Sequence, residues 1–198
     1  MKILLALASY LVGSFPTGYL FFRFSARQDI RSFGSGATGA TNVLRLKGWR
    51  LALPVALIDL AKGALPSIIA FRIFGDPGFA ALCASLAVLG HCFPVYIGFK
   101  GGKGVATAAG AMFALAPGPA ALSLAVFILV IALTRFVSLG SILAVILFPI
   151  FGLMLNHPRS LVLLSLPLVL VILARHRANI GRLLKGTESK VGRKASVT

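Results

Sequence analysis

Residues 99–104 read Phe-Lys-Gly-Gly-Lys-Gly and interrupt an apolar run that extends from residue 79 to residue 133. The run is long enough for more than one membrane crossing, because about 20 apolar residues suffice for one. Its polar interruption combines glycines, which let a ligand approach the backbone, with two lysines. A helix is expected to resume at Val105, so the loop would lie at a positive helix end that suits a phosphate. The alternative is a short turn with solvated lysines.

The loop does not match a Walker A sequence, because Gly104 stands where Ser or Thr would bind magnesium. The wider composition places the chain in a membrane. Of its 198 residues 58% are hydrophobic, more than a soluble domain can bury. Lys and Arg number 20 against four acidic residues, a formal net charge of +16. We therefore expect no metal site built from these scattered carboxylates and no cofactor.

Such an excess of positive charge would indicate a nucleic-acid partner in a soluble protein. Here the basic residues lie in short gaps between apolar runs, which indicates membrane topology and anionic ligands instead. We expect no nucleic-acid partner.

The apolar runs predict an all-α integral membrane protein with about seven transmembrane helices in a single domain, residues 1–198. The runs cover residues 3–24, 51–74, 79–97, 105–116, 120–133, 139–155 and 161–174. Because some runs are short, five crossings remain an alternative. With seven crossings, 16 of the 20 Lys and Arg residues fall on one side and three on the other. The positive-inside rule then places the N-terminus outside and a basic tail, at about residues 176–198, in the cytoplasm.

This topology brings three polar stretches to the cytoplasmic face: residues 34–45, 99–107 and 176–188. Membrane topology alone requires charge but not Gly-Ser-Gly or Gly-Gly-Lys-Gly, so a ligand site is favoured over ordinary basic connectors. Arg45 can bind a phosphate through two hydrogen bonds, and Lys103 adds a point charge. His176 and Asn179 would share one face if the last predicted helix continues past residue 174.

Three motifs in this order resemble those of the bacterial PlsY family, membrane acyl-phosphate:glycerol-3-phosphate acyltransferases. The motif residues are Gly34-Ser35-Gly36, Thr41-Asn42 and Arg45; Gly90-His91, Pro94 and Phe99 to Thr107; and His176-Arg177, Asn179-Ile180, Arg182-Leu183, Gly186 and Glu188. One departure is Ala37, where the family often has Asn. The resemblance covers almost the whole chain.

The resemblance implies transfer of a fatty acyl group from acyl phosphate to the 1-hydroxyl of glycerol 3-phosphate. The products would be lysophosphatidic acid and phosphate, in the first acylation step of phospholipid synthesis. The location would be the bacterial inner membrane, with the active site on the cytoplasmic face. Beyond the two substrates and membrane lipid, no obligate protein partner is inferred.

The expected catalytic residues are Ser35, His176 and Asn179. The expected phosphate-binding residues are Thr41, Asn42, Arg45, Gly101, Gly102, Lys103, Gly104 and Arg177. Acyl phosphate is already activated, so neither a metal nor an acyl-enzyme is required, and a substrate phosphate oxygen is expected to accept the hydroxyl proton. No histidine is followed five positions later by Asp, so the His-x4-Asp pair of other glycerolipid acyltransferases is absent. His176 is either a phosphate ligand or a general base, with the first preferred.

Several residues have alternative interpretations. Asp59 and Lys62 lie within the second predicted span and could mark a functional site, although mutual neutralisation is the expected role. His91 is expected to brace a helix and loop, and its neighbour Cys92 is expected to be a buried residue rather than a thioester nucleophile. A transporter or flippase for an organic phosphate is the rival function, and a lipid phosphatase is a third. A transporter would usually place its charges near the bilayer midplane.

Overall fold

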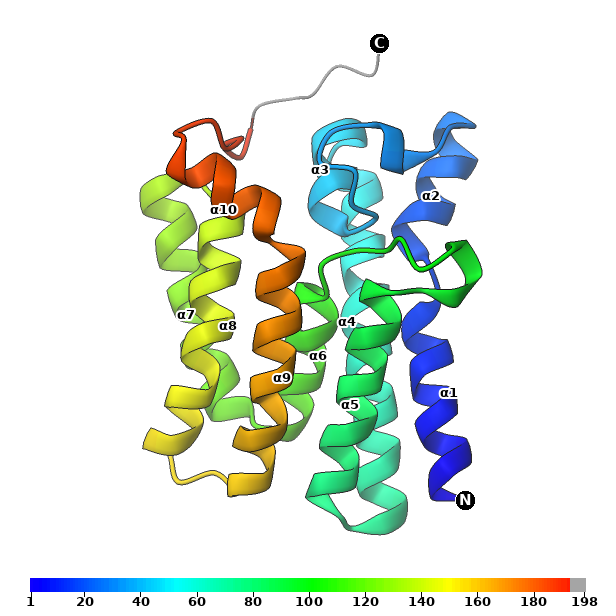
Figure 1. Ribbon diagram of the computed structural model, residues 1–198, viewed down its shortest axis with the longest axis vertical. Helices are drawn as coiled ribbons and strands as arrows, with labels where there is room; N and C mark the ends of the chain where they lie inside the picture. The colour runs from blue at the N-terminus through cyan, green and yellow to red at the C-terminus, as the bar shows by residue number, and fades with distance from the viewer. Residues whose placement is uncertain (193–198) are drawn as a thin grey trace.

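The computed structural model describes residues 1–192 and shows a bundle of long helices, with no strand in that part of the chain (Figure 1). The N-terminus and the segment that follows α10 lie at opposite ends of the bundle. The helices are α1 (Lys2–Ser14), α2 (Thr17–Ala26), α3 (Ala40–Lys47), α4 (Trp49–Phe74), α5 (Pro77–Cys92), α6 (Val105–Leu115), α7 (Pro117–Thr134), α8 (Val137–Met154), α9 (Arg159–Arg175) and α10 (Arg177–Leu184), with short 3-10 turns η1 (Ile30–Ser32) and η2 (Val95–Ile97).

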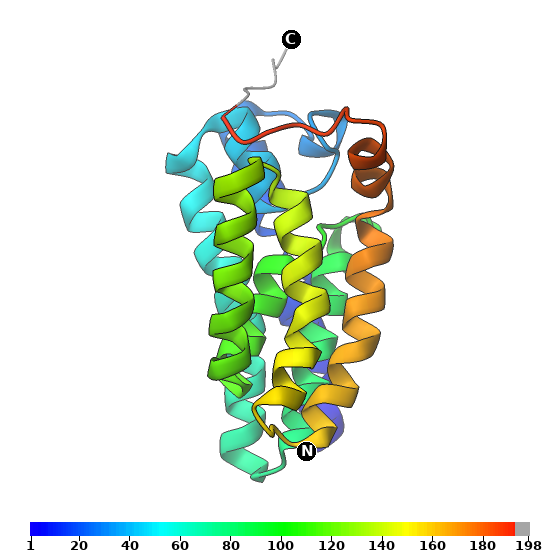
Figure 2. The same ribbon diagram turned by 90° about the vertical axis from the view of Figure 1, so that its left-hand side faces the viewer.

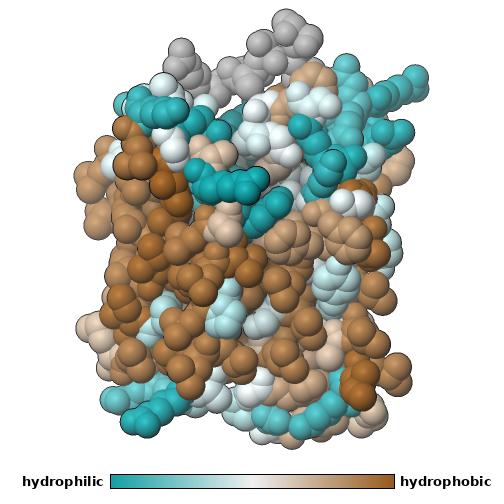
Figure 3. Space-filling view, viewed as in Figure 1, coloured by the Kyte–Doolittle hydropathy of each residue, from teal (hydrophilic) through white to brown (hydrophobic). Residues whose placement is uncertain are grey.

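The prediction of an all-helical membrane protein is confirmed. Within residues 1–192, five helical segments are long and apolar enough to cross a membrane: Lys2–Ala26, Trp49–Phe74, Pro77–Ile97, Pro117–Thr134 and Val137–Met154. A sixth is possible if α9 and α10, which meet at an angle of 59°, count as one span. An apolar band occupies the middle of the bundle, with polar groups toward both ends (Figure 3). Seven crossings stay a prediction, because α6 has only 11 residues.

Two boundaries differ from those expected. The predicted break at residues 117–119 is the start of α7, where a proline at the first helical position costs no hydrogen bond. The last long helix does not continue straight, the condition on which His176 and Asn179 would share one face, since α9 ends at Arg175 and the chain bends at His176. The tail beyond Gly192, part of the predicted basic tail, lies outside the described residues.

Glycines allow the central helices to pack closely. A Cβ atom at Gly63 would overlap the carbonyl oxygen of Thr107, and one at Gly110 would overlap that of Leu60. These contacts join α4 to α6, and Gly13 and Gly90 join α1 to α5 in the same way. Small residues of this kind let helices approach in lipid, where burial of apolar surface contributes little to association.

A buried ion pair lies in the middle of α4. Asp59 Oδ1 is 2.8 Å from Lys62 Nζ, and both side chains are at most 5% exposed. Lys62 also donates to the carbonyl oxygen of Phe15, at the break between α1 and α2. His91 Nδ1 lies 3.7 Å from the same carboxylate oxygen. This geometry agrees with a role in neutralisation and in tying α4 to the α1–α2 break.

Asp59→Ala should destabilise the fold strongly, because it leaves Lys62 as an uncompensated buried cation. The expected loss is about 3–5 kcal/mol in the free energy of unfolding. Lys2→Ala is the matched control, since the Lys2–Asp76 pair is exposed and screened by solvent, so its loss should cost much less. Reversible unfolding in detergent would measure both, and equal losses would contradict the role of the buried pair.

Candidate functional site

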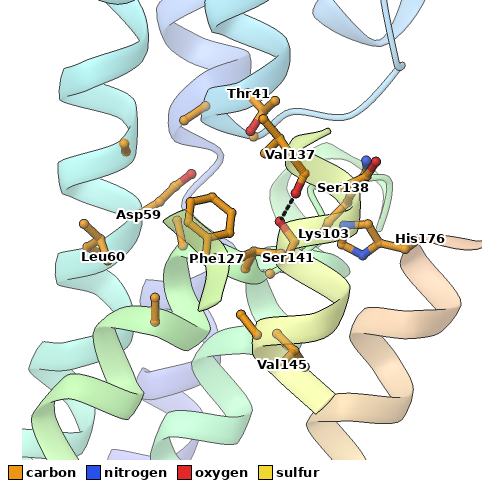
Figure 4. Close-up of a pocket in the computed structure, with 18 of the residues that line it drawn as sticks. Thr41, Asp59, Leu60, Lys103, Phe127, Val137, Ser138, Ser141, Val145 and His176 are labelled. Atoms are coloured by element: carbon orange, nitrogen blue, oxygen red, sulfur yellow. Dashed lines mark hydrogen bonds between the residues drawn. The ribbon is translucent and has the colours of Figure 1, made fainter. Parts of the chain in front are cut away.

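One cavity of about 330 Å³ lies inside the bundle at the end where α3 and α10 are found (Figure 4). Its polar lining consists of Ser35, Thr41, Asn42, Arg45, Asp59, His91, Lys103, Ser123, Ser138, Ser141, His176 and Asn179, and its apolar lining includes Leu60, Met112, Phe113, Leu124, Phe127 and Val145. The apolar part lies among α4, α6, α7 and α8. The cavity therefore suits a molecule with an anionic end and an apolar chain.

Asn179 connects the second and third polar stretches. Lys103 Nζ donates to Asn179 Oδ1 at 2.6 Å, and Asn179 Nδ2 donates to Glu188 Oε1 at 2.8 Å. The ammonium can only donate and the carboxylate only accept, so these two partners fix the orientation of the amide. Asn179 thus holds Lys103 at a set position in the cavity.

Glu188 was part of a motif in the sequence, but its role at the site was not predicted. The segment after α10 runs across this end of the bundle (Figure 2) and places the carboxylate inside, with its side chain 1% exposed. Ser138 donates to Oε1 at 3.0 Å and Arg182 to Oε2 at 2.7 Å. Although burial raises the pKa of Glu188, hydrogen bonds from Asn179, Arg182 and Ser138 outweigh it and hold the pKa below its usual value. The one available signal was that an acidic residue followed a strongly basic stretch.

Positive charge exceeds negative charge around the cavity. Arg45 lies 3.8 Å from the Glu188 carboxylate, with its side chain 13% exposed, and donates to the carbonyl of Ser189. Burial, followed by the nearby Arg45 cation, lowers the pKa of Lys103 to about 8. A bound anion would relieve this repulsion and favour the charged lysine.

His176 occupies the bend between α9 and α10, and its ring is buried. Nδ1 lies 2.8 Å from the carbonyl oxygen of Ile172. A carbonyl oxygen can only accept, so Nδ1 must carry the hydrogen. In the neutral ring, Nε2 is then an acceptor. In this tautomer a neutral His176 can bind a phosphate through Nε2 only by accepting from a protonated phosphate oxygen, whereas an imidazolium could donate there.

The first polar loop is organised by Asn42. Its Oδ1 accepts from the Ser35 N–H at 3.0 Å, and its Nδ2 donates to the carbonyls of Phe33 and Ala37. Both amide hydrogens are thus in use, so Asn42 braces the loop. The sequence had predicted instead that Asn42 would bind a phosphate. The bonds leave the Ser35 and Thr41 side chains at the cavity wall.

The glycine-rich loop contributes unequally to the cavity. Lys103 and Gly104 line it, whereas Gly101 and Gly102 are buried behind them. Arg177, expected to bind phosphate, is exposed and does not line the cavity. Cys92 is buried in the core behind Gly104, in agreement with its interpretation as a buried cysteine. No cluster of His, Cys, Asp or Glu within residues 1–192 could hold a metal ion.

Comparisons with known proteins agree with one another. The model of the glycerol-3-phosphate acyltransferase family matches residues 3–186. A glycerol-3-phosphate acyltransferase of Syntrophomonas wolfei is 44% identical over 94% of this chain and 95% of that protein. One of Thermoanaerobacter sp. is 39% identical over 98% of both chains.

Two solved structures are similar to this fold. The first is PlsY (YgiH), an integral membrane glycerol 3-phosphate acyltransferase, in its glycerol 3-phosphate form. It has a TM-score of 0.93 and 38% identity over 96% of each chain. The lysophosphatidic acid form has a TM-score of 0.89 and 37% identity over 97% of this chain and 96% of that one.

Binding of inorganic phosphate should weaken as the pH rises through about 8, where Lys103 of the empty site loses its charge. If only the charged form binds, affinity falls by up to about tenfold for each further pH unit. Lys103→Arg should bind phosphate with no such decline, because arginine stays charged. Calorimetric titrations between pH 7 and pH 10 would measure both proteins, and a flat wild-type profile would contradict the assignment to Lys103.

Proposed function

The chain belongs to the glycerol-3-phosphate acyltransferase family, and we propose that it transfers a fatty acyl group from an acyl phosphate to the 1-hydroxyl of glycerol 3-phosphate. The products are lysophosphatidic acid and phosphate, in the first acylation step of phospholipid synthesis. The observation that carries the proposal is the cavity, which joins a cationic end to an apolar part. An acyl phosphate fits both parts at once, and glycerol 3-phosphate needs only the cationic end.

The phosphates of the two substrates share the cationic end of the cavity. Arg45 supplies a guanidinium that can bind two phosphate oxygens, and Lys103 supplies a second charge. Ser35, in the loop before α3, and Thr41, in the first turn of α3, add hydroxyl donors. Gly104 precedes α6, whose free N–H groups favour an anion. Asn179 acts through Lys103, which it holds in place.

His176 orients the acceptor in this proposal. Its Nε2 accepts a hydrogen bond from the neighbouring 2-hydroxyl of glycerol 3-phosphate, because Nδ1 is committed to Ile172, and this leaves the proton of the 1-hydroxyl free to go to the phosphate. The hydroxyl oxygen forms a bond to the acyl carbonyl carbon, and the bond between that carbon and the phosphate oxygen breaks. The departing phosphate takes the hydroxyl proton, so the reaction needs no metal, cofactor or acyl-enzyme. Loop N–H groups stabilise the developing oxyanion.

The protein lies in the bacterial cytoplasmic membrane, with seven crossings formed by α1–α2, α4, α5, α6, α7, α8 and α9. The site lies at the cytoplasmic end, and the N-terminus is outside. The charge split of 16 to three supports this orientation, as does the presence of Arg45 and Lys103 in the cavity wall, with Arg182 bound to Glu188 beside them. A transporter would usually place such charges near the midplane.

Acyl phosphate should support synthesis of lysophosphatidic acid, whereas acyl-CoA should not, because the cationic end is built for phosphates and the chain has no His-x4-Asp pair. Purified protein in sealed vesicles would be given either donor and membrane-impermeant glycerol 3-phosphate. The external substrate should be used only where the cytoplasmic face points outward. Comparable turnover with acyl-CoA would refute the donor, and use in the opposite orientation would refute the topology.

His176→Asn should lower kcat about tenfold, the usual effect of losing one orienting hydrogen bond, with little change in the KM of either substrate. A general base would contribute about 10²–10⁴-fold, together with a group that titrates in the rate profile. Steady-state kinetics between pH 5.5 and pH 8.5 would separate the two. A rise in KM with retained kcat would instead identify His176 as a phosphate ligand.

A further inference from the structure

Arg175, at the end of α9, holds the glycine-rich loop from behind. Its Nε donates to the carbonyl oxygen of Gly102 at 3.0 Å, and its Nη2 donates to that of Gly101 at 2.7 Å. The guanidinium also lies over the Phe93 ring, 5.4 Å from its centroid. One fork-shaped group therefore fixes two consecutive carbonyls. Arg175 itself does not line the cavity.

These bonds decide which way the peptide groups of the loop face. All peptide bonds here are trans, so each carbonyl points away from the N–H of the following residue. Because the Gly101 carbonyl oxygen accepts from Arg175, the Gly102 N–H points to the opposite side, where it donates to the carbonyl oxygen of His91 at 3.1 Å. Because the Gly102 carbonyl oxygen also accepts from Arg175, the Lys103 N–H likewise points away from Arg175. That N–H has no backbone acceptor within residues 1–192.

Such an arrangement favours an anion over a cation. Glycines at 101 and 102 allow either face of the peptide to be turned toward a ligand, and carbonyl oxygens turned toward a phosphate would repel it. We propose that Arg175 is a positioning residue that binds the loop carbonyls so that the Lys103 N–H is free for a substrate phosphate. This inference rests on the proposed function, which supplies the two phosphate substrates.

The test uses Arg175→Gln and Arg175→Lys in the full-length protein. Gln loses the charge and the fork, while Lys keeps the charge but cannot reproduce the fork. Arg175→Gln should raise the KM of one substrate, glycerol 3-phosphate or acyl phosphate, by about tenfold, with less change in the other KM and in kcat. Arg175→Lys should show a smaller change in the same KM. The substrate affected identifies the phosphate at the loop.

Lys185→Gln is the matched control, because Lys185 is an exposed cation that follows Arg175 closely in the sequence. It should leave both KM values unchanged. Thermal unfolding in detergent would show that each variant is folded, and Arg175→Lys keeps the test available if Arg175→Gln does not fold.

The inference is overturned if folded variants keep both KM values, if only kcat falls, or if both KM values rise equally. It is supported if one KM rises selectively in Arg175→Gln and partly in Arg175→Lys. A wild-type protein that makes no lysophosphatidic acid from these substrates would refute the proposed function instead. An active wild type with unchanged Arg175 variants would refute the positioning role alone.

Discussion

Close contact between α4 and α6 is the constraint on which the site depends. In lipid, helices cannot rely on burial of apolar surface to associate, so backbone approach at Gly63 and Gly110 replaces it. This contact fixes the short α6 in the interior of the bundle. Because Gly104 precedes α6 directly, the same contact sets the depth at which the glycine-rich loop and Lys103 meet the cavity.

Around this fixed point, neutral Asn179 separates two opposite charges. Lys103 and Glu188 do not touch each other but bind opposite ends of the amide. Direct pairing with the carboxylate would satisfy the ammonium and reduce its attraction for a substrate. The carboxylate instead accepts from Arg182 and Ser138. The buried negative charge thus organises the site while Lys103 stays available to an anion.

The sequence was sufficient for the all-helical membrane fold and for the meeting of three polar stretches at one cavity. Long apolar runs have a direct physical meaning in a bilayer, and basic gaps predict which loops lie together, so Arg45, Lys103, His176 and Asn179 were correctly expected near one another. The bend at His176 could not be read, because no proline or glycine marks it. The sequence also could not predict the hydrogen bond between Glu188 and Ser138 or the bonds from Arg175 to residues 101–102, since such bonds join segments that are distant in the chain. Asn42 was assigned to a ligand because its type can bind phosphate, but its local bonds to the loop are satisfied first.

The shape of the cavity has a consequence for how the two reactants reach the site. One part opens among polar groups at the end of the bundle, and the other lies among apolar helices. Occupancy of the site by a hydrophilic acceptor therefore depends on the molar concentration of the acceptor in the aqueous phase. Occupancy by an acyl donor depends on the mole fraction of the donor in the bilayer. Diluting the membrane with inert lipid starves the enzyme of one reactant and leaves the supply of the other untouched. Under the proposed function, catalysis therefore takes place at a phase boundary, with the acceptor supplied from water and the acyl donor from lipid.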